Sequence, residues 1–222
     1  MLVVIEGPDG AGKSTQVKRL KEYLLQKCGS LEYIHFPRYE APVYGDMISR
    51  LLRGEFGNVD PMLIALLFAQ DRRDAIPQLR ASLDRGETVL LDRYVYSNIA
   101  YQCSKVGDAQ KAEELRDWIL DTEYEVFGLP KPDLNIFLDV PIDFVQSNLT
   151  KSREGSDRDY LAGGTDIHEK DIELQRSVLA IYRAQAARDP HFITVDCSDE
   201  QGHMLPADAI FERIKSVVDK NL

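Results

Sequence analysis

Short apolar runs alternate with longer segments of mixed polarity along the whole of this chain. The apolar runs have the length of buried strands, and the pattern predicts strands at residues 2–6, 32–36, 88–92, 133–140 and 192–196. Helices are expected near 13–27, within 42–85, up to about 127, and at 143–151, 166–188 and 206–220. Because strands that alternate with helices form parallel sheets covered on both faces, the pattern predicts a single α/β domain over 1–222. Its five-stranded parallel sheet should bind ligands at the carboxyl ends of the strands.

The first expected strand is followed at once by a complete phosphate-loop motif, Gly-x-x-x-x-Gly-Lys-Ser, at residues 7–14. Its glycines let the backbone N–H groups wrap a polyphosphate, and the helix that starts near Lys13 adds the positive end of its dipole. Lys13 is expected to span the β- and γ-phosphates, and the Ser14 hydroxyl to ligate Mg²⁺. The motif predicts a nucleoside triphosphate site made by Gly7, Asp9, Gly10, Ala11, Gly12, Lys13, Ser14 and Thr15.

The composition argues against several classes of partner. Hydrophobic residues make up 44% of the chain, yet no apolar run approaches the roughly 20 residues that cross a bilayer. No signal segment precedes the first strand, and Cys28, Cys103 and Cys197 lack the spacing of a metal site. The net charge of −10 opposes binding to nucleic acid or to an anionic membrane. We therefore expect a cytoplasmic protein whose anionic ligands are held by locally placed arginines.

A second group of candidate residues follows the third expected strand. An acidic residue at such a strand end commonly orients Mg²⁺ or its waters, which makes Asp92 the expected partner of Ser14, directly or through water. Arg93 would then point to the same pocket. The alternative is that Asp92 only caps the next helix and that Arg93 is a surface residue beside it. Arg38, in Phe36-Pro37-Arg38-Tyr39 after the second strand, offers a forked grip on phosphate or is an ordinary loop arginine.

Two expected helices carry side chains suited to reading a base. Phe68 and Arg72 lie four residues apart and share a helical face, so a ring able to stack lies beside a guanidinium able to donate. The alternative is a core Phe and a solvated Arg. In the helix after the third strand, Tyr101 shares a face with Ser97 and Asn98, and a carboxamide both donates and accepts at a pyrimidine edge.

The one long unpatterned polar stretch, residues 152–166, is expected to be a mobile surface loop. By itself its charge content, which includes Arg153 and Arg158, indicates a solvated run. Its place after the fourth strand and the helix that follows favours a different function. We expect a lid of about 151–165 that closes over a transferred phosphoryl group, excludes water and stabilises negative charge.

Together these segments resemble thymidylate kinases along nearly the whole chain. The resemblance rests on residues 7–15 (Gly-Pro-Asp-Gly-Ala-Gly-Lys-Ser-Thr), 36–39 (Phe-Pro-Arg-Tyr), Phe68 with Arg72, 92–94 (Asp-Arg-Tyr) with Ser97, Asn98 and Tyr101, 129–133 (Leu-Pro-Lys-Pro-Asp) and 158–160 (Arg-Asp-Tyr). Asp-Arg-Tyr separates this group from other P-loop proteins better than the phosphate loop does. The resemblance implies a P-loop NTPase fold and transfer of the γ-phosphoryl group of the co-substrate ATP to dTMP, giving dTDP and ADP.

The resemblance also implies roles at the base and sugar of the acceptor. Phe68 would stack on thymine, Arg72 would donate to O4, and Asn98 would pair with N3. Tyr101 would crowd the 2′ position and so favour deoxyribose. The other residues expected to bind the acceptor are Asp9, Phe36, Arg38, Arg93, Ser97 and Tyr160.

At the phosphate end, the resemblance implies that Asp9 touches the 3′-hydroxyl of the acceptor or its magnesium shell, and that Arg38 and Arg93 clamp the acceptor phosphate. Some members place the phosphate-binding arginine one residue later, where this chain has Tyr39. Part of the family also carries an arginine in the phosphate loop where this chain has Gly10, and in the remainder the lid supplies that charge. The expected catalytic residues are Lys13, Arg93, Asp9 and a lid arginine, Arg153 or Arg158.

Two other functions stay open at this point. One is another nucleotide kinase, or a deoxynucleoside kinase, on the same fold. The other is a nucleotide-dependent switch or binding module, although the segment nearest to a guanine-reading Asn/Thr-Lys-x-Asp motif, residues 150–153, lacks the final Asp. The resemblance further implies a homodimer, for which the helices around Ala65 and Ala100 are expected to offer apolar surface.

Overall fold

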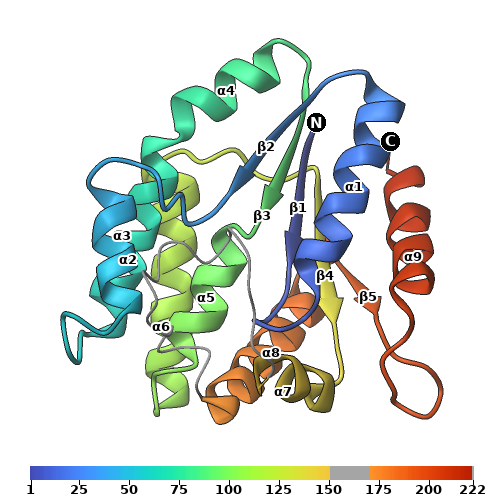
Figure 1. Cartoon of the computed structure of the whole chain (residues 1–222). Coiled ribbons are helices and arrows are strands. Elements are labelled where there is room, and N and C mark those ends of the chain that lie inside the picture. The colour runs from blue at the N-terminus through green and yellow to red at the C-terminus, as the bar shows by residue number, and fades with distance from the viewer. Residues whose placement is uncertain (151–170, 222) are drawn as a thin grey trace.

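A computed structural model describes residues 1–150 and 171–221 of the protein. Five parallel strands form one sheet in the order β2-β3-β1-β4-β5 (Figure 1). Their bounds are β1 Leu2–Glu6, β2 Leu31–His35, β3 Thr88–Asp92, β4 Leu134–Asp139 and β5 Phe192–Asp196. Each predicted strand is confirmed, with no end displaced by more than one residue. The three central strands, β3, β1 and β4, are almost wholly buried, whereas the edge strands β2 and β5 are buried only in part.

Helices connect the strands and follow the last one. Their bounds are α1 Lys13–Cys28, α2 Tyr44–Leu52, α3 Pro61–Asp74, α4 Ile76–Asp84, α5 Val95–Cys103, α6 Ala109–Leu120, α7 Ile142–Thr150, α8 Ile172–Arg188 and α9 Ala207–Asp219. A π-helical segment, η1 (Asp121–Val126), continues α6. The predicted helix start at 166 lies outside the described residues, and the prediction is wrong at Asp171, which directly precedes α8. Asp171 is extended there and caps the helix by accepting from the N–H groups of Glu173 and Leu174.

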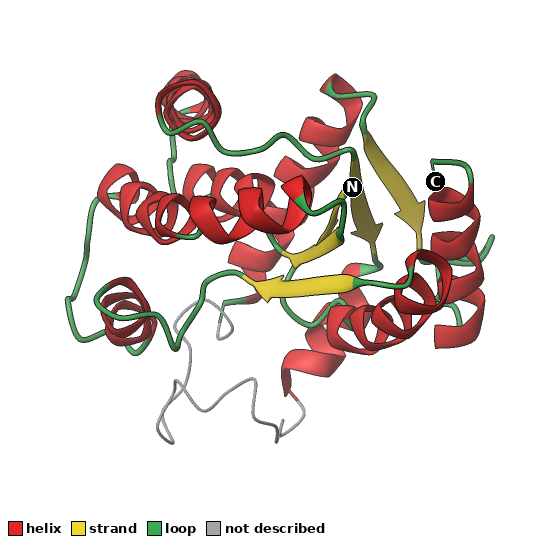
Figure 2. Ribbon diagram, turned by 90° about the horizontal axis from the view of Figure 1, so that it is seen from above, coloured by secondary structure: helices red, strands yellow, loops and turns green. Residues whose placement is uncertain are grey.

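Alternate residues of β1 build two hydrophobic layers, because successive side chains of a strand point to opposite faces. Leu2 and Val4 belong to the cluster made with α3, α5, α6 and α8, whereas Val3 and Ile5 belong to the one made with α1 and α9. Figures 1 and 2 show helices on both sides of the strands accordingly. The structure thus confirms the predicted α/β fold.

The central place of β1 positions the site. It lies between β3 and β4, and Ile5 is in register with Asp92. The loop after β1 and the Asp-Arg-Tyr segment after β3 therefore emerge side by side at the carboxyl edge, where open α/β sheets bind their ligands.

The apolar surface expected near Ala100 is absent, because all nine residues of α5 are buried within the chain. Ala65 is also fully buried, although Met62 and Leu63 in the first turn of α3 are exposed. Among the described residues, no helix is both long and apolar enough to cross a membrane.

Candidate active site

The phosphate loop has the conformation that its glycines predict. Gly10 and Gly12 both have a φ of 77°, a left-handed value that L-residues rarely adopt, and Gly12 stands immediately before α1. No side chain of the described residues caps this helix, so its first N–H groups point to the loop. A helix start of this kind is suited to bind phosphate oxygens.

The side chain of Lys13 is hydrogen-bonded to the backbone of the phosphate loop. Its Nζ donates to the carbonyl oxygens of Gly7 and Pro8, each at 3.2 Å. Burial, assisted by the positive charge of Arg93, lowers the pKa of Lys13 to about 8. The ammonium is thus poorly compensated in this state, and an incoming polyphosphate would supply the missing negative charge.

The residues expected to hold Mg²⁺ fit that ion. Asp92 is 6% exposed at the end of β3, and its Oδ1 is a buried acceptor with no hydrogen-bonding partner among the described residues. Ser14 is exposed at the start of α1. In the described ranges, no group of three or more His, Cys, Asp or Glu side chains could hold a metal. Mg²⁺ commonly binds through one or two protein oxygens together with substrate phosphates, which matches this sparse set.

Arg93 lies between the phosphate loop and α5. Its Nη1 donates to the Gly7 carbonyl at 3.0 Å and to Ser97 Oγ at 3.1 Å, and its Nη2 contacts Asp9 Oδ1 at 2.6 Å. Burial alone lowers the pKa of Arg93, but the negative charges around it, those of Asp9 and Asp92 included, outweigh this effect and hold the pKa well above its usual value. The guanidinium is therefore a permanent positive charge in the site.

Asp9 is held from three sides. Besides Arg93, its backbone N–H donates to Tyr101 Oη at 2.9 Å and to Gln175 Oε1 at 3.1 Å. The Gln175 amide in turn donates to Asp9 Oδ2 at 3.2 Å. Burial raises the pKa of Tyr101 well above its usual value, so its ring remains a neutral phenol. These contacts fix the direction of a carboxylate at the mouth of the phosphate loop.

Arg72 and Asn98 lie together at the other end. Arg72 is 2% exposed and forms two hydrogen bonds with Glu123, from Nε and, at 2.7 Å, from Nη2. Asn98 Nδ2 donates to the Ala65 carbonyl at 3.0 Å and to Glu123 Oε1 at 2.9 Å. The Asn98 Oδ1 atom is buried without a partner among the described residues.

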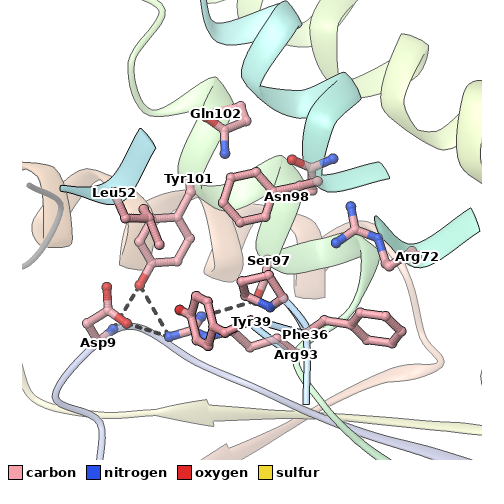
Figure 3. Close-up of a pocket in the computed structure, with 12 residues that line it drawn as sticks. Asp9, Phe36, Tyr39, Leu52, Arg72, Arg93, Ser97, Asn98, Tyr101 and Gln102 are labelled. Carbon is pink, nitrogen blue, oxygen red and sulfur yellow. Dashed lines mark hydrogen bonds and ion pairs between the residues drawn. The ribbon is translucent and has the colours of Figure 1, made fainter. Parts of the chain in front are cut away.

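A single pocket joins these two groups, with Asp9, Tyr101 and Arg93 at one end and Arg72 and Asn98 at the other (Figure 3). It is lined by Asp9, Phe36, Pro37, Tyr39, Leu52, Phe68, Arg72, Arg93, Ser97, Asn98, Tyr101 and Gln102. The helical spacing of Ser97, Asn98 and Tyr101 places them on one wall.

The structure brings most of the predicted acceptor-binding residues together but not Arg38. The Arg38 guanidinium donates to Asp71 Oδ1 at 2.9 Å and to Asp74 Oδ2 at 2.8 Å, and Arg38 is not among the lining residues. Two carboxylates of α3 thus hold the guanidinium here, and its place in a phosphate clamp stays a prediction. Tyr39 lines the pocket instead. Arg153, Arg158, Tyr160 and the expected lid lie outside the described residues.

Several site residues escaped the sequence interpretation. Tyr39, Leu52 and Gln102 line the pocket, and Gln175, Glu123 and Glu6 orient the residues that do. Gln102 directly follows Tyr101, and Tyr39 is in the motif already singled out, so both had a local signal. Gln175, which lies 166 residues from Asp9, had none.

Comparison with known proteins agrees with this geometry. A family model described as thymidylate kinase matches residues 5–204. The chain belongs to the thymidylate kinase family. It is 35% identical over 190 residues to a thymidylate kinase of Mycobacterium tuberculosis, with 85% of this chain and 86% of that one covered. A Plasmodium falciparum thymidylate kinase is 31% identical over 196 residues, with 88% and 81% covered.

Solved structures agree with the family assignment. The thymidylate kinase of Candida albicans has a TM-score of 0.75 and 26% identity, and the match covers 99% of this chain and 91% of that chain. The Ehrlichia chaffeensis enzyme, at 22% identity and a TM-score of 0.67, supports the fold alone. This member of the thymidylate kinase family is a dTMP kinase, a transferase that phosphorylates dTMP, and a kinase family implies ATP as co-substrate.

Proposed function

We propose that dTMP lies along the pocket with its thymine between Phe68, Arg72 and Asn98 and its phosphate beside Arg93. The observation that carries this proposal is the continuity of one pocket from the base-reading pair to the Asp9–Arg93 group at the phosphate loop. In this orientation the acceptor phosphate faces the helix start at which the phosphates of ATP would bind.

The chemistry that this arrangement supports is an in-line transfer without a covalent intermediate. Lys13 would leave the Gly7 and Pro8 carbonyls and neutralise the phosphoryl group in motion, while Arg93 holds the acceptor phosphate. Ser14 and Asp92 would hold Mg²⁺, which supplies positive charge to the phosphates when bound. Asp9 would accept from the 3′-hydroxyl of the sugar. A lid arginine, Arg153 or Arg158, stays a prediction.

We also propose that the protein acts as a homodimer in the cytoplasm. Four of the exposed large hydrophobic side chains lie on α2, on α3 or in the turn between them, and they are Met47, Phe56, Met62 and Leu63. A second copy of this chain would cover them. The thiols of Cys103 and Cys197 are buried and unpaired, which suits a reducing compartment.

Parallel turnover of dTMP, dUMP, dGMP and thymidine, read as ADP formation that depends on the added acceptor, tests the acceptor assignment. We expect dTMP to have the highest kcat/KM, and thymidine to be poor because it lacks the phosphate that Arg93 would hold. Efficient use of thymidine would instead favour a deoxynucleoside kinase on the same fold. ATP hydrolysis that no acceptor stimulates would favour a nucleotide-dependent binding module.

A further inference from the structure

Glu123 joins the two residues that lie at the base end of the pocket. It is fully buried in the π-helical segment η1, and its two carboxylate oxygens receive hydrogen bonds from both Arg72 and Asn98. It lies 51 residues from Arg72 and 25 from Asn98, and it does not itself line the pocket. Wide helical turns of this kind are frequent at functional sites.

The Asn98 amide can face only one way in this setting. Both hydrogens of its Nδ2 are directed to groups that only accept, the Ala65 carbonyl and Glu123 Oε1. The reversed orientation would set Asn98 Oδ1 against two other acceptors. Its oxygen is therefore the atom left for a ligand, and it is buried without a partner among the described residues.

Glu123 fixes the donor of the pair in the same way. Its carboxylate accepts hydrogen bonds from Nε and Nη2 of Arg72. Within the described chain, no hydrogen bond involves the remaining nitrogen of that guanidinium, Nη1. One acceptor and one donor thus lie together at the pocket wall. They match an N3–H beside a C4 carbonyl, as in thymine, and oppose the N3 acceptor and 4-amino donor of cytosine.

We propose that Glu123 is a positioning residue that sets this polarity and thereby makes the enzyme select a 4-oxo pyrimidine over a 4-amino one. The inference rests on the proposed base-reading roles of Arg72 and Asn98. A carboxylate is required because it only accepts. A glutamine of the same shape carries its own N–H₂ group, which would let the Asn98 amide turn over.

The test compares the parent enzyme with Glu123→Gln and Glu123→Asp, using dTMP and dCMP at saturating ATP. Glu123→Gln is expected to lower the dTMP/dCMP ratio of kcat/KM by about tenfold or more, a typical effect of one mispaired base edge. The change should appear in the KM for dTMP, with the KM for ATP nearly unchanged. Glu123→Asp keeps an acceptor-only group and is expected to restore most of the ratio.

Glu125→Gln is the matched control, because Glu125 lies in the same segment but is exposed and paired with Lys131 at 3.0 Å. Its ratio should equal that of the parent. A Glu123→Gln enzyme that loses efficiency equally for dTMP and dCMP would overturn the inference, since that result indicates packing alone.

The variant Asn98→Ala distinguishes a failure of this inference from a failure of the proposed base-reading role of Asn98. If Asn98→Ala leaves the ratio unchanged, the base-reading role of Asn98 fails and the inference with it. If Asn98→Ala lowers the ratio and Glu123→Gln does not, only the inference fails.

Should Glu123→Gln no longer bind ATP, the paired change Arg72→Met with Glu123→Leu replaces the buried ion pair by apolar side chains, which proteins often tolerate. Its ratio should then approach one, and a ratio equal to the parent's would overturn the inference.

Discussion

Arg93 has a backbone that an arginine rarely adopts. Its φ is 69°, in the left-handed region that side chains with a Cβ disfavour. Its N–H donates to the Ile5 carbonyl at 3.0 Å, and its guanidinium has partners on the phosphate loop and α5. These contacts offset a strain on the order of 1–3 kcal/mol. The conformation aims a cation at the place where the proposed acceptor phosphate and the phosphate loop meet.

Lys13 gives the site a dependence on pH. Its pKa of about 8 means that the ammonium is present below pH 8 and is lost above it. Because bound phosphates favour the charged form, ATP binding should raise this pKa. We expect binding at pH 8 to take up roughly half a proton, binding at pH 6.5 to take up almost none at this residue, and ATP affinity to fall at higher pH.

Calorimetry in buffers of different ionisation enthalpy measures that uptake. Lys13→Met is the control, since it should bind ATP weakly at every pH. Binding to the parent at pH 8 without any proton uptake would contradict the expected state of Lys13.

The helix α5 shows how one element depends on another. Its start has no cap from its own N-cap residue, Tyr94, and the buried carboxylate of Glu6 on β1 accepts from the N–H groups of Tyr94 and Ser97 instead, at 2.9 and 3.2 Å. Burial is the main cause that raises the pKa of Glu6, against the opposing effect of Ser97 and Arg93. A carboxylate at a helix start is stabilising. β1 therefore positions the pocket wall as well as the phosphate loop.

The helix α2 packs against the Phe36–Tyr39 loop with no space for a side chain. A Cβ added at Gly45 would lie 2.5 Å from the carbonyl oxygens of Arg38 and Tyr39. Gly45→Ala should therefore lower the free energy of unfolding by about 1–3 kcal/mol, although alanine ordinarily favours a helix. Since Tyr39 lines the pocket, the KM for dTMP should rise as well.

Urea unfolding and steady-state kinetics measure both effects. Gly107→Ala is the matched control, because a Cβ at Gly107 meets nothing within 4 Å. We expect it to change stability by no more than about 0.5 kcal/mol. Equal stability of the two variants would show that the loop moves aside freely.

At the scale of the whole molecule, a net charge of −10 surrounds a site for two anions. The site offsets this charge with three cations that are largely shielded from water, where charges interact strongly: Lys13 and Arg72 are buried, and the Arg93 side chain is 12% exposed. The exposed apolar side chains proposed for the dimer lie on α2, on the turn after it and at the start of α3, and none of them is among the residues that line the pocket. The proposed dimer contact and the pocket thus use different side chains.

The proposed dimer has a direct test. The parent should sediment at twice the 25.2 kDa of one chain, whereas Leu63→Glu should sediment as a single chain because it buries a charge in the interface. Leu25→Glu is the control, since Leu25 is exposed at 52% on α1, across the sheet. A parent of 25.2 kDa at micromolar concentration would contradict the proposal.

The sequence by itself determined the five strands, the phosphate loop, and the residues that end β1 and β3. These are local features, since burial pattern and glycine content specify strands and a phosphate loop within a few neighbouring residues. It also predicted most of the pocket lining, because helical spacing places Ser97, Asn98 and Tyr101 together. The roles of these residues in binding stay predictions.

Only the tertiary structure decided which partner each charged or polar side chain finds. Arg38 could have faced a phosphate or a carboxylate, and the position of α3 beside its loop gave it Asp71. Gln175 and Glu123 reach the site from distant segments, so no local spacing indicates them. Hydrogen bonds act over about 3 Å whatever the separation along the chain, and the fold alone sets that distance.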